Sequence, residues 1–249
     1  MRTIIVVVIT LLSLAGCVTT GDKKVEPKQM AEGYYLRGQA YFQEKNYELA
    51  AVEFHRAIQT DPANKWSYYY LGIISDYQDK LDEAIKFYKE AIGIDSDFSE
   101  SWNALGAAYS RQQKWNDAIK AFNRALDNKL YTTPHVPYLN LGRVYKAQKN
   151  YDKSIEAYKN AKRYSNQDYI VIELGTTLIE AGRVKEAVSE FQDDVKLSPQ
   201  NASLRYNLAL AYLKDGKKKA ALAEFKAAAD LAPNTEISTK ANEYMKSLR

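Results

Sequence analysis

Residues 99–126 read SESWNALGAAYSRQQKWNDAIKAFNRAL, and the spacing of small and aromatic residues in them is the main evidence for the fold. Gly106 is followed twelve residues later by a second small residue, Ala118, and an aromatic residue, Phe122, comes four residues after that. Apolar residues at helical spacing surround both small positions, so the stretch predicts two helices that lie against each other.

The same pattern recurs along most of the chain. The first small residue returns after steps of 34, 34, 36, 33 and 34 residues, at Gly38, Gly72, Gly106, Gly142, Gly175 and Ala209. The second small residue stands at Ala50, Ala84, Ala118, Ser154, Ala187 and Ala221, and the aromatic at Phe54, Tyr88, Phe122, Tyr158, Phe191 and Phe225. A fixed period of this length is typical of an array of helix pairs, and such arrays hold partners.

The physical chemistry of helix packing accounts for this pattern. Two helices that cross at short distance need small residues at the facing positions, because larger side chains would push the backbones apart. We therefore expect Gly or Ala of the first helix to face Ala or Ser of the second, with the aromatic filling the gap toward the next pair. Each pair leaves an apolar face that only a neighbour can cover.

Each unit resembles a tetratricopeptide repeat. The resemblance rests on Tyr34, Gly38, Tyr41, Ala50, Phe54, Ala57 and Pro62 in the first unit, and on Trp102, Leu105, Gly106, Tyr109, Ala118, Phe122 and Ala125 in the third. The expected units are 31–64, 65–98, 99–134, 135–167, 168–201 and 202–235, and Pro62, Pro199 and Pro233 close three of them. The resemblance implies an all-α fold, a right-handed superhelical solenoid of six tetratricopeptide helix pairs over residues 31–235.

The last units depart from the pattern. Asp194 occupies a position usually held by Ala, and Ala209 replaces Gly. Residues 236–249 are expected to form a capping helix, because one helical face carries Ile237, Ala241, Tyr244, Met245 and Leu248. A solenoid otherwise ends on an exposed apolar face, so such a helix has a structural purpose.

The N-terminus has the features of a secretory signal. Met1 and Arg2 precede an apolar run from Thr3 to Leu14, which is too short to span a bilayer because spanning takes about 20 residues. The run Leu14-Ala15-Gly16-Cys17 resembles the lipobox of bacterial lipoproteins, in which cleavage leaves an acylated cysteine as the first residue. We expect residues 1–16 to be a lipoprotein signal peptide and Cys17 to carry fatty acids such as palmitate. The alternative is a plain signal peptide with a coincidental cysteine.

Residues 17–30 are expected to form a lipidated flexible tether, because Val18 to Met30 has no apolar period. By resemblance to sorted lipoproteins of double-membrane bacteria, Val18 in place of Asp favours the outer membrane, with the array facing the periplasm. The tether reaches at most about 45 Å, so the array should stay close to the membrane.

Composition argues against several function classes. The chain has 35 Lys and Arg against 31 Asp and Glu, an excess too small to indicate nucleic-acid binding. Neither His55 nor His135 has Cys, Asp or Glu at metal-ligand spacing, and no phosphate-binding loop or nucleophile elbow is present. We expect no enzyme activity, no cofactor, no metal and no small-molecule substrate.

Function is then expected in the groove lined by the first helices. By the mapping used for tetratricopeptide repeats, the first two repeats present Tyr35, Gln39, Phe42, Trp66, Tyr69, Ile73 and Tyr77. The later repeats present a more mixed set, namely Asn103, Ala107, Arg111, Leu139, Arg143, Ile172, Thr176, Tyr206 and Leu210. Grouped exposed aromatics mark a protein-binding site, whereas the alternative is that many of the tyrosines only add packing.

The expected groove is hydrophobic. Chaperone-binding tetratricopeptide proteins hold a C-terminal carboxylate with Lys and Asn on successive first helices, whereas the matching positions here carry Tyr35 and Gln39, then Tyr69 and Ile73. An apolar strand or helix of a partner protein fits such a groove better than a peptide carboxylate does.

One insertion indicates a more specific resemblance within the tetratricopeptide-repeat proteins. The segment from Leu130 to Pro134 lengthens the step after the third repeat by two residues, and Asn140-Leu141-Gly142 follow it. With the six repeats, the lipobox and the short tether, this resembles the pilotin lipoproteins of type IV pilus systems. The resemblance implies a protein that binds secretin subunits and promotes their outer-membrane targeting and multimer assembly. A general envelope adaptor that recruits peptidoglycan enzymes or outer-membrane assembly factors is the alternative.

Overall fold

The computed structural model describes residues 26–248, and all regular structure in that range is helical. The six pairs are α1 (Pro27–Gln43) with α2 (Tyr47–Thr60), α3 (Lys65–Tyr77) with α4 (Leu81–Ile94), α5 (Ser99–Arg111) with α6 (Trp115–Asp127), α7 (His135–Ala147) with α8 (Tyr151–Tyr164), α9 (Asp168–Glu180) with α10 (Val184–Leu197), and α11 (Ala202–Lys214) with α12 (Lys218–Leu231). A final helix, α13 (Glu236–Ser247), follows the sixth pair. The predicted all-helical solenoid of six pairs and a terminal helix is therefore confirmed.

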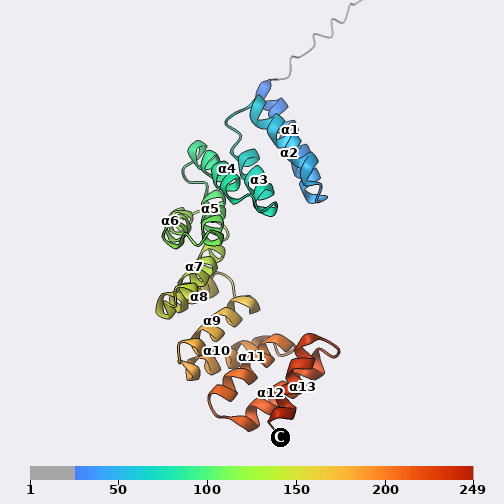
Figure 1. Cartoon of the computed structure of the whole chain (residues 1–249), viewed down its shortest axis with the longest axis vertical. Coiled ribbons are helices and arrows are strands. Elements are labelled where there is room, and N and C mark those ends of the chain that lie inside the picture. The colour runs from blue at the N-terminus through green and yellow to red at the C-terminus, as the bar shows by residue number, and fades with distance from the viewer. Residues whose placement is uncertain (1–25, 249) are drawn as a thin grey trace, which may run out of the picture.

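The pairs stack one after another along a curved path. Figure 1 shows the stack running from α1 and α2 at one end to α12 and α13 at the other, with α4 and α6 on the outside of the curve. First helices contact one another along the stack, as α3 does with α5, α5 with α7, and α9 with α11. The first helices therefore line the inner side, which is where the groove was expected.

The start of the array differs from the expectation. Helices α3, α5, α7, α9 and α11 begin at the unit boundaries that the repeat pattern predicts, but α1 begins at Pro27. Residues 27–30 are thus helical, and the tether expected to extend to Met30 is shorter by these four residues. Proline favours the first turn of a helix, where its missing N–H would have no partner anyway. The signal peptide 1–16, Cys17 and the rest of the tether up to residue 25 lie outside the described residues.

A ring packed against a glycine holds each of the first five pairs together, whereas the sixth pair has Ala209 at that position. A Cβ atom added to Gly106 would lie 2.6 Å from a ring carbon of Phe122, and one added to Gly38 would lie 2.6 Å from Phe54. The small residue of the second helix also reaches the first, since the Ser154 hydroxyl donates a 2.8 Å hydrogen bond to the Gly142 carbonyl. The sequence pattern placed the aromatic toward the next pair only, whereas its edge fills the missing Cβ position in its own pair.

The same rings also connect neighbouring pairs, as the sequence predicts. Phe54 of the first pair stacks on Tyr70 of the second, with ring centroids 5.0 Å apart. Phe225 of the sixth pair stacks on Tyr244 of α13 at 4.9 Å. Each ring therefore contributes to packing both within a pair and between pairs, so the pairs are expected to stabilise one another.

The two ends of the solenoid are closed in different ways. At the N-terminal end of the described residues, Arg37 stands one period before the buried Leu71, on a face of the first pair that no other described pair covers. Its guanidinium donates to the Glu53 carboxylate at 2.9 Å, and Arg56 donates to the same carboxylate at 2.6 Å. At the C-terminal end, α13 covers the last pair by burying Ala241 against its apolar cluster.

Asp194, the departure from the repeat pattern in the fifth unit, ties two pairs together. Its side chain is 3% exposed and accepts hydrogen bonds from Lys162 at 2.6 Å and from Asn166 at 3.0 Å. Burial alone would lower the pKa of Lys162, but its hydrogen bonds with Asp194 and Glu190 outweigh this and keep the pKa above 10.5. The Asp194 carboxylate therefore joins α10 to α8 through its hydrogen bond with Lys162.

The contact between ring and glycine predicts a matched pair of stability changes. Gly106→Ala should lower the free energy of unfolding by about 1–3 kcal/mol, because its Cβ overpacks the buried Phe122 ring. Gly93→Ala, in α4, is the control, because a Cβ there meets nothing within 4 Å. It should leave stability unchanged or raise it by about 0.5–1 kcal/mol. Urea unfolding followed by circular dichroism measures both, and equal effects would contradict this account of the packing.

The burial of the Tyr88 phenol predicts that the protein loses stability at alkaline pH. Burial, with the nearby Asp76 carboxylate, raises the pKa of the Tyr88 phenol well above its ordinary value of 10.0. Above pH 10 the unfolded chain loses this proton while the folded chain keeps it, so stability is full below pH 10 and falls as pH rises further. Tyr88→Phe, the residue type that four other repeats carry, should reduce the loss at pH 11 by about 1 kcal/mol. Urea unfolding at pH 8 and pH 11 measures this, and equal losses in both proteins would contradict it.

Candidate partner-binding groove

The aromatic residues expected in the first two repeats meet around Phe42 and Tyr70. The Phe42 ring lies 5.1 Å from Tyr70 and 6.4 Å from Tyr77, measured between centroids. Tyr35 lies 6.1 Å from Tyr70, and the Gln39 side chain donates a 3.2 Å hydrogen bond to the Tyr70 hydroxyl. Four expected residues are thus brought together, but at a tyrosine that the repeat mapping did not include.

A second aromatic group lies beside the first. Trp66 and Tyr69 pack against Phe98, with centroid distances of 4.6 Å and 5.5 Å. Tyr69 also lies 5.6 Å from Tyr70, which joins the two groups into one continuous network. Ile73 packs into the apolar cluster between the second and third pairs.

Exposure divides the expected residues. The Tyr77 side chain is 66% exposed and Trp66 is 37% exposed, so these two offer the most surface to a partner. Tyr35, Gln39, Phe42, Tyr69 and Ile73 are only partly exposed. Much of the tyrosine-rich stretch therefore packs one repeat onto the next, which was the alternative explanation of its composition.

The inserted segment after α6 lies beside this aromatic network. The Asn128 side chain donates a 3.1 Å hydrogen bond to the Asp97 carbonyl, which draws the segment toward the second pair. Burial raises the pKa of the Tyr69 phenol, and the Tyr131 phenol and Glu100 carboxylate nearby add to this. The insertion thus places Tyr131 close to Tyr69 and leaves Leu130 exposed to solvent.

In the middle of the groove, basic and acidic side chains form ion pairs with one another. Arg111 of α5 binds Asp76 of α3 and also donates to Asp79 at 2.5 Å. Farther along, Arg143 of α7 lies 3.2 Å from Glu173 of α9, and Lys146 of α7 lies 3.0 Å from Glu180. These pairs join successive first helices, so the middle repeats offer a partner few uncompensated charges.

The C-terminal part of the groove contains an apolar hollow of about 510 Å³ between α9, α11 and α13. Thr176 and Leu210, which the sequence placed in the groove, line it. The other lining residues were not expected: the apolar or aromatic Ile179, Leu213 and Tyr244, and the polar Glu180, Asn207 and Lys214. Ile179 and Leu213 lie three residues after Thr176 and Leu210, as Phe42 does after Gln39. Applying this three-residue step to the later repeats would have predicted both residues from the sequence. Leu139 was also expected in the groove but is buried in the core.

Two features are absent from the described part of the chain. No group of three or more His, Cys, Asp and Glu side chains between residues 26 and 248 is placed to hold a metal ion. No helix in the same range is long and apolar enough to cross a membrane.

Comparison with known families identifies the repeats. Models of the tetratricopeptide repeat match residues 31–64, 77–113, 99–128, 137–168 and 172–235. These matches cover most of the array and include segments of all six pairs.

Comparison with individual proteins finds relatives of two kinds. The human intraflagellar transport protein 88 homolog is 27% identical over 136 residues, which are 52% of this chain and 16% of that protein. The chain similarly spans only 21% of protein bimA of Emericella nidulans. In contrast, the type IV pilus assembly protein PilF of Pseudomonas aeruginosa is 25% identical over 217 residues, which are 84% of this chain and 86% of PilF.

Solved structures share the fold. The structure of Pseudomonas aeruginosa PilF superimposes with a TM-score of 0.71 and 19% identity, over 88% of this chain and 99% of that one. The structure of PilW, described as a widely conserved type IV pilus biogenesis factor, gives 0.72 and 20%, over 86% and 99%. At these identities the likeness establishes the architecture.

The aromatic network predicts two different outcomes for two neighbouring tyrosines. Tyr69→Ala should lower the free energy of unfolding by about 3 kcal/mol, because its ring packs against Phe98, Trp66 and Tyr70. Tyr77→Ala should cost less than about 1 kcal/mol, because most of its ring is in solvent. Urea unfolding of both variants measures the difference, and a larger loss from Tyr77 would contradict the division into packing and surface residues.

Proposed function

Because the chain belongs to the tetratricopeptide-repeat family, we propose that it is a protein-binding scaffold of type IV pilus biogenesis. In finer terms, it acts as a lipid-anchored pilotin that promotes outer-membrane targeting and multimer assembly of the pilus secretin. The observation that carries this proposal is the match to PilF, which extends over 84% of this chain and 86% of PilF. The match to intraflagellar transport protein 88 homolog covers only 16% of that protein, so it supports shared repeats and nothing more.

The groove supports binding of an apolar partner segment. Its aromatic stretch exposes Trp66 and Tyr77, and its C-terminal hollow is lined by Ile179, Leu210 and Leu213. Between these two regions, charged side chains of the array form ion pairs with one another. Covering paired charges with an apolar segment has a lower desolvation cost than covering unpaired charges. A strand or helix of a secretin subunit laid along the first helices would bury its apolar side chains at both regions.

The N-terminal sequence supports the proposal that this binding takes place at the outer membrane. Acylated Cys17 would hold the chain in the outer membrane, and the residues between Cys17 and Pro27 would allow a separation of at most about 30 Å. Subunits captured there reach a high local concentration, and the groove covers apolar segments and strand edges until the pore closes. Anchoring thus turns a binding groove into an assembly factor.

A general envelope adaptor is the second candidate. The same groove would then recruit peptidoglycan enzymes or outer-membrane assembly factors. The range of similar proteins supports it, because the repeats also match the peroxisomal targeting signal receptor of Kluyveromyces lactis. The two candidates differ in the partner rather than in the binding mechanism.

The pilotin proposal predicts a defect in secretin assembly. Cells without the gene should lose the detergent-resistant secretin multimers detected by immunoblot, while secretin monomers persist. Leu210→Glu combined with Leu213→Glu should have the same effect, because two carboxylates in the C-terminal hollow oppose binding of an apolar segment. Cys17→Ala should move the protein out of the outer-membrane fraction and reduce the multimers.

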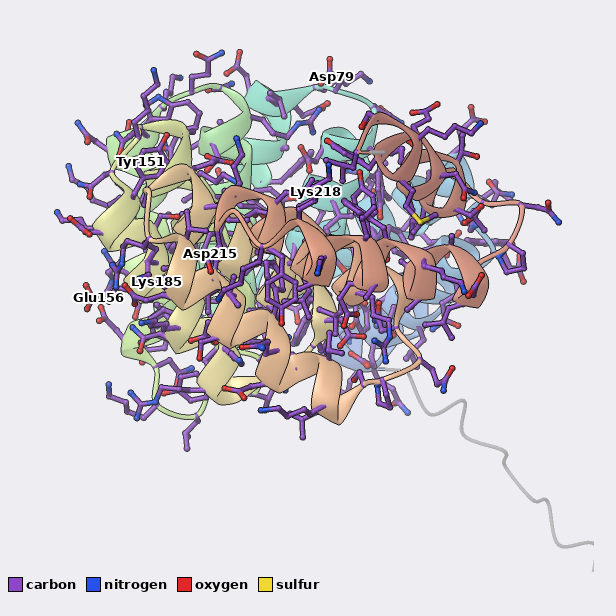
Figure 2. The ribbon with its side chains drawn as sticks, turned by 90° about the horizontal axis from the view of Figure 1, so that it is seen from below. Asp79, Tyr151, Glu156, Lys185, Asp215 and Lys218 are labelled. Carbon is purple, nitrogen blue, oxygen red and sulfur yellow. The ribbon has the colours of Figure 1, made fainter. Side chains whose placement is uncertain are left out.

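The control for the groove variant introduces the same number of glutamates at exposed positions: Lys218→Glu combined with Lys219→Glu, at the start of α12. Figure 2 labels Lys218 in this last part of the array. The control should keep normal multimers, and both proteins should keep a normal helical spectrum. Multimers that persist in cells without the gene would rule out the pilotin role and leave the envelope adaptor.

A further inference from the structure

A second apolar hollow, separate from the groove, lies between α4, α5 and α6. Its volume is about 560 Å³, and its floor consists of Ile92, Trp102, Leu105, Tyr109 and Ala121. Two of its three helices, α4 and α6, are second helices on the outside of the curve (Figure 1). The hollow is therefore independent of the surface on which the proposed function depends.

One small residue helps to shape this hollow. Ala121 stands one period after Phe87, three residues beyond the repeated alanine in each case. Phe87 packs against the cluster that joins the first and second pairs, and its ring lies 6.0 Å from that of His55. Alanine at the equivalent position between the second and third pairs has no ring to fill this space, and Ala121 lines the hollow. The hollow is thus the size of at least one large side chain and opens to solvent at its rim.

Trp102 forms a fixed wall of the hollow. Its indole N–H donates a 2.8 Å hydrogen bond to the Ser96 carbonyl, which fixes the ring at one edge. The Arg124 guanidinium lies 5.5 Å from the centroid of the same ring. A rigid indole offers a large apolar contact with little side-chain entropy to lose, which is the property of residues that dominate binding sites.

The rim of the hollow carries an excess of positive charge. Lys89, Lys120 and Arg124 border it, against the single carboxylate of Asp117. Arg124 is paired with Asp127 at 3.0 Å, but Lys89 and Lys120 form no ion pair within residues 26–248. Lys89 instead lies 5.8 Å from the ring centroid of Tyr109. Two ammonium groups thus remain available to carboxylates of a partner beside an apolar floor.

We propose that this hollow binds an acidic segment of a partner protein, which inserts one aromatic or large aliphatic side chain between flanking carboxylates. The inserted side chain would take the place that Phe87 fills between the first two pairs, and the carboxylates would reach Lys89 and Lys120. The volume lies within the range of about 300–1,000 Å³ usual for ligand pockets. Lys23, Lys24 and Lys28 make the chain's own N-terminal segment a poor match for this rim.

The shape of the site favours a peptide over a membrane surface. Membrane-surface binding buries apolar side chains that project beyond the charged groups around them. Here Leu105 and Ala121 are buried in the lining. Lys89 and Lys120 are exposed, so the apolar surface is recessed behind the charged groups. A side chain that projects from a partner fits this arrangement, and the array can then hold two partners at once.

The probe is a fluorescein-labelled pentapeptide with a central Phe and two Glu residues on each side, titrated with the full chain by fluorescence anisotropy. We expect saturable binding that weakens as salt is added, because the lysine contacts are screened. Ala121→Phe should weaken binding by about tenfold or more, because its ring fills the hollow in the way that Phe87 fills the preceding one. Lys89→Glu combined with Lys120→Glu should have a similar effect through the rim.

Two controls keep the test decisive. Lys218→Glu combined with Lys219→Glu changes the net charge equally at exposed positions away from the hollow and should leave binding unchanged. A peptide with Ala in place of Phe should bind at least about tenfold more weakly than the probe. Circular dichroism of each variant establishes that it is folded.

Three results would overturn the proposal. The first is no saturable binding of the probe peptide to the unmodified chain. The second is binding that folded Ala121→Phe retains in full. The third is binding to phosphatidylglycerol vesicles that needs Lys89 and Lys120 and is unaffected by Ala121→Phe, because that pattern assigns the basic rim to a membrane surface. None of these results bears on secretin assembly, since the groove variants test that separately.

Discussion

In the first five helix pairs an aromatic ring packs where a glycine has no Cβ atom, and this contact sets how closely the two helices approach each other. Because Gly106 has no Cβ, the edge of Phe122 can occupy that space and the two helices can lie close together. The same kind of ring extends toward the following pair, as Phe54 does toward Tyr70. Repetition of this contact stacks the pairs along a curve and brings the first helices together on its inner side.

Departures from the repeat pattern occur at the end of the stack and at one contact between two pairs. Arg37 replaces a buried leucine at the end of the array, where its pairing with Glu53 gives the first pair a polar outer face. Asp194 replaces alanine inside the stack, where Lys162 and Asn166 satisfy the buried carboxylate. Elsewhere charged side chains stand in solvent, as Glu156 and Lys185 do at the outer edge in Figure 2. The irregular residues thus determine where the array ends and how its pairs are joined.

The array presents two surfaces of different chemistry. The groove is apolar at both ends, and the ion pairs in its middle are satisfied within the protein, which suits an apolar segment of a partner. The outer hollow joins an apolar floor to the unpaired ammonium groups of Lys89 and Lys120, which suits an acidic segment. The two surfaces come from different faces of the array and can be altered one at a time.

The helix pairs, their period and the final helix could be predicted from the sequence, because they depend on the spacing of apolar and small residues within each segment. The sequence also placed Tyr35, Trp66 and Tyr77 on first helices, but only the stacking decided that Tyr77 is largely exposed while Tyr69 is packed against Phe98. The C-terminal hollow around Leu213 and Tyr244, and the outer hollow above Ala121, were likewise decided by the tertiary structure. Each is formed by side chains from different repeats, and whether such side chains cover one another depends on how neighbouring pairs are oriented, which the spacing within a single repeat does not specify.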